Sequence, residues 1–185
     1  MASQTIASPR PAPPAFSRLS ITMHWLMLVL LAAVYACIEL REFYPRGSDV
    51  REALKTWHFM LGLSVFGLVW VRLIARARSP RRPPPRTWTD MLAAAVHVAL
   101  YGLMIALPVL GWMLLSAEEK SVPFFGLSLP PLVAPDKALA ERIEDLHTTI
   151  ATVGYWLVGV HAAAALSHHY LLRDGTLRRM LPGRP

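Results

Sequence analysis

The chain has 185 residues, of which 54% are hydrophobic and only 17% are charged. Soluble domains are usually about a quarter charged, and the apolar residues here gather in long runs, so the composition favours membrane spans over a globular core. The net charge of +7 does not indicate nucleic-acid binding, because the basic residues flank the hydrophobic segments, as they do in membrane proteins.

Four hydrophobic segments follow an N-terminal tail. Residues 1–18 are rich in proline and are interpreted as disordered. The hydrophobic segments are residues 19–40, 53–75, 88–116 and 139–172. Each is long enough to cross a bilayer core, which is about 30 Å thick and needs about 20 helical residues. We therefore predict an all-α fold, an integral membrane four-helix bundle at 19–172, followed by a basic cytoplasmic tail at 173–185.

The third and fourth segments have features of their own. Pro108 lies inside the third segment, where a proline kinks a transmembrane helix but is tolerated. The fourth segment is longer than a bilayer needs, so it should tilt or project its ends into water. Between them, residues 121–136 contain four prolines and are predicted to form a rigid outer loop.

The basic residues of the connections set the predicted orientation. The connection between the second and third segments and the C-terminal tail are rich in arginine, whereas the other two connections carry both signs of charge. Because cytoplasmic connections carry an excess of lysine and arginine, both termini are predicted to face the cytoplasm.

Four histidines lie inside the hydrophobic segments at two matched depths. His147 and His161 are fourteen residues apart in the fourth segment. This separation is about 21 Å along a helix and returns to within about 40° of the same face. Counted from the helix rise, His58 lies at the depth of His147 on the outer side, and His24 at the depth of His161 on the inner side. Ionisable side chains at such depths are costly and indicate a function.

Two imidazoles on facing helices can hold a haem iron between them, and the core of a bundle is a usual place for such a cofactor. The depths therefore predict one haem between His24 and His161 and another between His58 and His147. The chain has no Cys-x-x-Cys-His motif for covalent attachment. Two alternatives stay open: histidines that only hydrogen-bond to neighbouring helices, and a zinc or copper site, for which inner-side carboxylate or thiolate partners are missing.

Two further residues of the segments have two interpretations each. Gly154 lies seven residues from both histidines of the fourth segment, on the same helix face. It would let two porphyrin edges approach the helix, or it would allow ordinary close helix packing. His97, about 14 Å into the third segment, could compete with His24 for the inner iron. A hydrogen-bonded structural role or a propionate contact is the alternative for His97.

Polar residues at the two membrane faces are the remaining candidates. His168 and His169 lie at the cytoplasmic end of the fourth segment, and His168 shares the face of His161. A histidine at the interface exchanges protons near neutral pH, which suits a quinone site, although an interfacial polar pair is the simpler alternative. On the outer side, Arg41 and Arg46 could pair with propionates or attract a small anion, with solvated loop charges as the default.

Several stretches resemble the bacterial di-haem cytochrome b561 family, and within it the members that oxidise superoxide. The resembling stretches are His24–Trp25, 39–46, 71–74, 105–111 and 146–147, and the most specific one, which runs from Gly154 to Pro182. The resemblance covers nearly the whole chain from Leu19 onward, but it is loose at 121–136 and excludes the proline-rich start.

The resemblance implies a four-helix bundle with two haems b in a bacterial inner membrane. His24 and His161 would ligate one haem, His58 and His147 the other, and ubiquinone would bind near His168. The implied enzyme is a superoxide:ubiquinone oxidoreductase, which oxidises superoxide to dioxygen at the periplasmic face and passes the electrons to ubiquinone. This activity requires the lipid bilayer but no protein partner and no nucleic acid.

The outer charges are a departure from what this substrate needs. A positive surface would steer the superoxide anion, yet residues 117–145 carry six acidic and three basic side chains. Any positive cluster must be local, and Arg41, Arg46 and Lys120 are the candidate anion-attracting residues, with Arg51 nearby. The rival functions are an electron-carrier subunit that links the quinone pool to a partner dehydrogenase, and a non-redox membrane protein.

Overall fold

The computed structural model describes residues 17–78 and 87–181, so almost all of the tail predicted to be disordered lies outside the described residues. The long helices are α1 (Arg18–Leu40), α2 (Asp49–Ala77), α3 (Trp88–Ala117) and α4 (Lys137–Ser167). Each is long and apolar enough to cross a membrane. The prediction of an all-α membrane bundle is confirmed, and α2 begins four residues earlier than expected.

A polar side chain caps the N-terminus of each long helix. Ser17, Ser48 and Asp136 each accept a hydrogen bond from a backbone N–H of the first turn. Thr87 and Asp90 form a reciprocal capping box at the start of α3. A cap of this kind contributes about 0.5–2 kcal/mol, so each helix start is fixed locally before any packing is considered.

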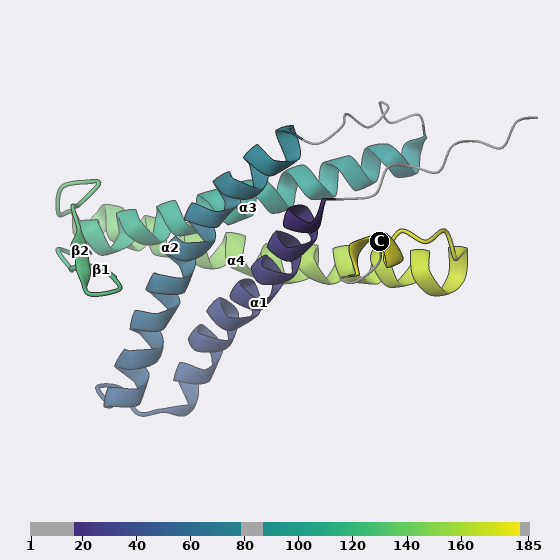
Figure 1. Cartoon of the computed structure of the whole chain (residues 1–185). Helices are drawn as coiled ribbons and strands as arrows, with labels where there is room; N and C mark the ends of the chain where they lie inside the picture. The colour runs from purple at the N-terminus through teal and green to yellow at the C-terminus, as the bar shows by residue number, and fades with distance from the viewer. Residues whose placement is uncertain (1–16, 79–86, 182–185) are drawn as a thin grey trace, which may run out of the picture.

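The long helices form two antiparallel hairpins that cross each other. α1 packs along α2 and α3 along α4, and the hairpins meet mainly through α2 and α3. Figure 1 shows the α1–α2 pair running obliquely across the α3–α4 pair. Met27, Val65, Val69 and Met104 form the buried cluster between α1, α2 and α3. This small core holds the hairpins at the crossing angle on which the site depends.

Many large apolar side chains lie on the outside of the bundle. Val98, Trp156 and Val160 are 72%, 75% and 57% exposed. In water such a surface would be unfavourable, whereas in a bilayer these side chains contact lipid. The distribution of apolar residues is therefore that of a membrane protein.

The proline-rich outer connection contains a short hairpin that the sequence analysis did not predict. β1 (Val122–Phe124) and β2 (Leu127–Leu129) pair antiparallel through residues 125–126. Both turn residues have positive φ, 46° and 87°, as in a tight two-residue hairpin turn. Trp112 Nε1 donates to the Pro130 carbonyl at 2.9 Å, which ties the connection back to α3.

The chain turns back on itself after α4. A π-helical turn, η2 (His168–Leu172), ends at Arg173, whose backbone is left-handed with φ of 50°. The chain then returns through η3 (Arg178–Met180) to α1, where Trp25 Nε1 donates to the Met180 carbonyl at 2.6 Å. The segment predicted as a basic tail is therefore folded against the bundle in its described part.

Candidate functional site

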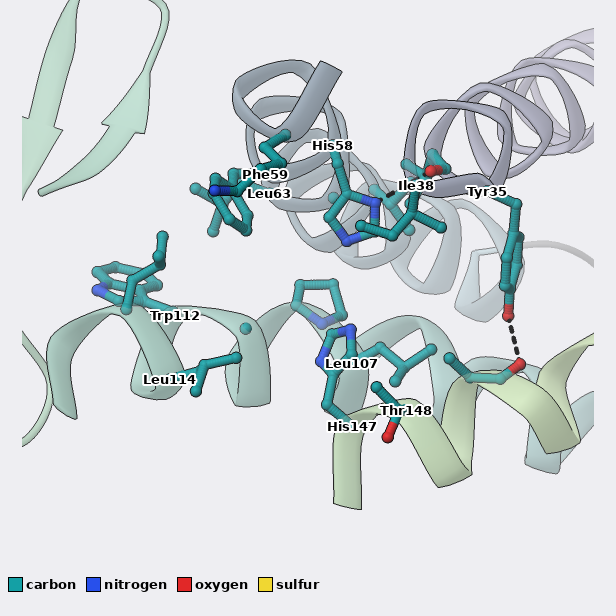
Figure 2. A pocket seen from close by; sticks show the side chains of 18 of the residues that line it. Tyr35, Ile38, His58, Phe59, Leu63, Leu107, Trp112, Leu114, His147 and Thr148 are labelled. Atoms are coloured by element: carbon teal, nitrogen blue, oxygen red, sulfur yellow. Dashed lines mark hydrogen bonds between the residues drawn. The ribbon is translucent and has the colours of Figure 1, made fainter. Parts of the chain in front are cut away.

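The hairpins leave a cavity of about 590 Å³ between them. It lies at the end of the bundle that carries the connections 41–48 and 118–136, which we call the outer end; the opposite end is the inner end. Its volume is within the range of about 300–1,000 Å³ usual for small-molecule and cofactor sites. His58 of α2 and His147 of α4 face each other across it (Figure 2).

The outer histidine rings have the spacing that a shared metal requires. Their centroids are 6.3 Å apart, with 64° between the ring planes. Two ligating rings, each with its nitrogen about 2 Å from the metal and about 1.1 Å from its own centroid, would stand roughly 6.3 Å apart. His58 Nδ1 lies 3.0 Å from the Val34 carbonyl, which can only accept. Nδ1 therefore carries the proton, and Nε2 is free to act as a ligand.

His147 has an unmet polar group. Its buried Nδ1 forms no hydrogen bond with any of the described residues, and the nearby Leu107 carbonyl lies outside hydrogen-bond geometry. Gly111 leaves room for the ring, because a Cβ there would lie 3.5 Å from His147 Cε1. A buried polar atom without a partner is costly, so this ring is in an environment that a bound ligand would complete.

A second histidine pair lies at the inner end. His24 of α1 and His161 of α4 have centroids 6.2 Å apart and ring planes at 67°. The ring of His97 lies 5.3 Å from that of His161, closer than two rings sharing a metal, and His97 Nδ1 donates to the Ala93 carbonyl at 2.6 Å. The spacing thus favours His24 over His97 as the partner of His161.

Each pair offers only two protein ligands. In the part of the chain that the structure describes, no three His, Cys, Asp or Glu side chains gather closely enough to hold a metal ion. A zinc or copper site usually takes at least three protein ligands. A haem brings its own equatorial nitrogens and needs only axial ligands. The residues present therefore fit haem better than a bare metal ion at both positions.

Gly154 is buried on α4 between the two pairs. A Cβ there would overlap the Tyr35 hydroxyl and lie 2.7 Å from Leu103 Cδ1. The same hydroxyl donates to the Ala151 carbonyl at 3.0 Å, as Figure 2 shows. Of the two roles considered for Gly154, the structure contains the close helix packing.

Two of the three candidate anion-attracting residues line the outer cavity. Arg41 and Lys120 are among its lining residues, and Arg46 is exposed outside it. Arg41 Nε lies 2.9 Å from a Glu42 oxygen, and Lys120 Nζ lies 3.0 Å from a Glu118 oxygen. The positive charge of both cavity residues is thus partly neutralised by neighbouring carboxylates.

Three further cations lie near the two ends, and of these Lys55 and Arg72 were not singled out from the sequence as site residues. Lys55 also lines the outer cavity and pairs with Glu52 at 2.9 Å, a spacing that in the sequence looks like an ordinary solvated helix face. Arg51 donates to backbone carbonyls of the α1–α2 connection, so it holds that connection together. Arg72 of α2 lies 3.0 Å from His24 Nδ1. Only the fold brings these groups to the sites.

A hydrogen-bonded network follows α4 at the inner end. His168 Nδ1 lies 2.6 Å from Asp174 Oδ2, and Thr176 N donates to Asp174 Oδ1 at 2.9 Å. Arg179 Nη2 donates to Thr176 Oγ1 at 3.1 Å. Partial burial raises the pKa of Asp174, but hydrogen bonds from His168 and Thr176 outweigh it and lower the pKa to about 2. Asp174 is therefore ionised near neutral pH and keeps a proton on His168 Nδ1.

The network reaches the inner histidine pair through α1. Trp25, which is bonded to Met180, has its ring 5.7 Å from that of His24. Arg179 Nε is buried and has no hydrogen-bond partner among residues 17–78 and 87–181. His169 instead contacts the ring of Tyr170. The inner end thus combines an imidazole–carboxylate pair with an unmet hydrogen-bond donor.

Comparison with known proteins gives matches over nearly the whole chain. A family model described as "Prokaryotic cytochrome b561" matches residues 15–183. The chain is 38% identical over 172 residues to "Cytochrome b561 homolog 1" of Escherichia coli (strain K12), which covers 91% of this chain and 98% of that protein. It is 36% identical over 170 residues to "Probable superoxide oxidase CybB" of Yersinia pestis, and the aligned region covers 90% of this chain and 96% of that protein. Identity to "Cytochrome b561 homolog 2" of Escherichia coli (strain K12) is 28% over 180 residues, and the aligned region covers 91% of this chain and 92% of that protein.

Proposed function

Because this chain belongs to the prokaryotic cytochrome b561 family, and is therefore a haem b-binding, multi-pass membrane protein of electron transfer, we propose that it oxidises superoxide at its outer end and reduces ubiquinone at its inner end. The observation that carries this proposal is the pair of matched histidine sites, with ring centroids 6.2 Å and 6.3 Å apart. The choice of superoxide is supported by the identity to the Yersinia pestis protein named as a probable superoxide oxidase.

The proposed cofactors are two haems b, with the four matched histidines as axial ligands. His58 and His147 would hold the outer haem, and His24 and His161 the inner one. When bound, the haems supply one-electron storage and transfer between the two ends of the bundle. α4 sets their separation, because its fourteen-residue spacing between histidines corresponds to about 21 Å.

The proposed reaction balances over two superoxide anions and one ubiquinone. Each superoxide gives up one electron and leaves as dioxygen, and ubiquinone takes both electrons with two protons to become ubiquinol. Since Asp174 holds the Nδ1 proton of His168, His168 Nε2 is the atom that can take up a proton from water and pass it to a quinone oxygen, once for each of the two protons. Arg179 Nε is a second donor that a quinone carbonyl could accept from.

The proposed location is the bacterial inner membrane with both termini in the cytoplasm. The arginine-rich connection and C-terminal tail support this orientation. The outer cavity then faces the periplasm, where Arg41 and Lys120 are the cavity-lining anion-attracting residues and Arg46 is an exposed cation outside the cavity. No protein partner is required for turnover in this arrangement.

A stopped-flow experiment on the purified, oxidised protein tests the proposal. A pulse of superoxide should reduce the haems within the mixing time or shortly after it, as seen in their absorption bands. Ubiquinone added next should reoxidise the haems. Bound haem that ignores superoxide but is reduced by a quinol would exclude superoxide oxidation. A preparation without haem bands would exclude the ligand assignment as well.

A second candidate function is an electron-carrier subunit that connects the quinone pool to a partner dehydrogenase. It is favoured by the small acidic excess of the cavity lining, where the cations Arg41, Lys55 and Lys120 face one more carboxylate among the described residues: Glu39, Glu52, Glu118 and Glu144. Such a surface suits a cationic docking partner better than an anionic substrate. Haem that turns over only when a dehydrogenase is supplied would support this function.

A further inference from the structure

Arg72 is a cation placed beside the inner histidine pair. Its Nη2 lies 3.0 Å from His24 Nδ1, and its Nε donates to the Tyr101 hydroxyl at 3.0 Å. The guanidinium carbon lies 5.8 Å from the centre of the Tyr101 ring. No carboxylate of the described residues forms an ion pair with Arg72. A partly buried guanidinium in a membrane-spanning helix without an anion is costly, so its position requires an explanation.

The contact between Arg72 and His24 cannot persist when His24 is a metal ligand. A guanidinium only donates hydrogen bonds, so in the present arrangement His24 Nδ1 accepts and Nε2 carries the proton. A histidine that ligates through Nε2 carries its proton on Nδ1 instead. Two donors repel each other, so the guanidinium must turn away from His24 when the inner site is filled. Tyr101 keeps it beside that site.

We propose that Arg72, held by Tyr101, is the anion-binding residue of the inner site: it pairs with a carboxylate of the inner haem and raises the reduction potential of that haem. This inference rests on the proposed function, which supplies the haem. Haem b carries two propionate groups, and a guanidinium binds a carboxylate with two parallel hydrogen bonds. A cation beside the iron favours the reduced, less positive state, because the local positive charge is then smaller.

The cations of the outer cavity differ from Arg72 because each is paired with a carboxylate: Arg41 with Glu42, Lys55 with Glu52 and Lys120 with Glu118. His58 Nδ1 itself lies 3.0 Å from the Val34 carbonyl, so its direct polar contact is neutral. Arg72 therefore makes the two sites electrostatically different, with the higher potential expected at the inner one. Electron transfer from the outer haem to the inner haem, toward His168 and the quinone, would then be favourable.

A redox titration followed by haem absorbance tests this inference without any turnover. Arg72→Gln should lower the inner midpoint so that the equilibrium constant for reduction falls at least tenfold, which is about 59 mV for one electron. Arg76→Gln removes the same charge from an exposed position one turn along α2 and should leave both midpoints unchanged. In His147→Ala, which lacks an outer ligand, the one remaining step of the titration gives the midpoint of the inner haem.

Two milder variants cover the case in which Arg72→Gln fails to retain the inner haem. Arg72→Lys keeps the charge and Tyr101→Phe keeps the guanidinium, so both should retain the haem with a reduction constant within tenfold of the unsubstituted protein. An Arg72→Gln protein with both haems and unchanged midpoints would overturn the inference, as would loss of the haem in Arg72→Lys. Absence of haem from the unsubstituted protein would instead refute the proposed function.

Discussion

Gly154 of α4 lies directly against the Tyr35 side chain of α1 and the Leu103 side chain of α3. Replacing it with alanine should destabilise the protein by about 1–3 kcal/mol, because the new Cβ overlaps the Tyr35 hydroxyl and crowds Leu103. Thermal unfolding followed by circular dichroism in detergent measures the effect. Gly159→Ala is the matched control, since a Cβ there meets nothing within 4 Å and should be neutral or slightly stabilising.

Adding Tyr35→Phe to Gly154→Ala should recover part of the lost stability, because it removes the hydroxyl that the new Cβ meets. If the double variant is no more stable than Gly154→Ala alone, the Tyr35 contact is not the cause. The hydroxyl also loses its bond to the Ala151 carbonyl in this variant, so the recovery should be incomplete.

The four matched histidines make separable predictions about cofactor content. His147→Ala and His161→Ala should each lose one haem and keep the other, halving the haem-to-protein ratio measured by the pyridine haemochrome assay. His97→Ala should keep both haems, because the His97 ring is too close to His161 to share a metal with it. Retention of two haems in His161→Ala together with loss in His97→Ala would reverse the inner assignment.

At the scale of the elements, the segment after α4 carries the proposed proton path to the quinone. Asp174→Asn removes the negative charge that holds the Nδ1 proton on His168. Haem reoxidation by ubiquinone should slow by about tenfold or more, since the proton donor is no longer oriented, whereas haem reduction by superoxide should not change. Glu141→Gln, an exposed carboxylate of α4 outside the cavity lining, is the control. Equal rates in both variants would remove Asp174 from the proton path.

The same carboxylate predicts a pH dependence. The pKa of Asp174 is lowered to about 2 in the folded chain, compared with about 3.9 for an unfolded aspartate. Its contribution to docking of the C-terminal segment is thus complete above about pH 4 and lost as the pH falls through about 2. Trp25 fluorescence, obtained by difference from Trp25→Phe, should change in that window. Asp174→Asn should lack the change; if it shows the same transition, another group is responsible.

The sequence predicts the helical elements well, because long apolar runs and the helix rise are local properties. The same rise places the four histidines at two depths, and the fold brings each predicted pair to about the spacing of shared ligands. The β1–β2 hairpin could not be predicted, because its turn has phenylalanine at a position of positive φ. That conformation depends on distant contacts of Phe125, with the Trp57 ring and with Met60 Sδ.

Tertiary contacts also explain the residues that the sequence analysis missed. Asp174 lies in a stretch whose composition is that of a basic tail, and only the left-handed turn at Arg173 brings it back to His168. Arg72 and Lys55 are ordinary helix residues until the crossing of the hairpins places them beside the histidine sites. Depth along a helix can be counted from the sequence, but the neighbour across a crossing cannot.

At the scale of the whole molecule, the outer end is electrostatically balanced. Since the cations of the cavity are paired with carboxylates, haem reduction by superoxide should change by less than about threefold between low and physiological salt, in contrast to the larger effect of strong steering. Stopped-flow rates at several salt concentrations measure this. Glu118→Gln, which frees Lys120, should raise the rate and its salt dependence, and Lys120→Gln should lower the rate. A steep salt dependence in the unsubstituted protein would contradict the balanced surface.

The contribution of α4 to both histidine pairs has a consequence for biogenesis. His24 and His58 belong to the first hairpin, whereas both of their partners lie on the last long helix in chain order. During synthesis the first three helices can enter the membrane, but neither of the two proposed haem positions is complete until α4 has joined them. In the proposed arrangement, cofactor loading is therefore a late step of maturation that joins the two hairpins, and a nascent chain interrupted before α4 should be inserted in the membrane without bound haem.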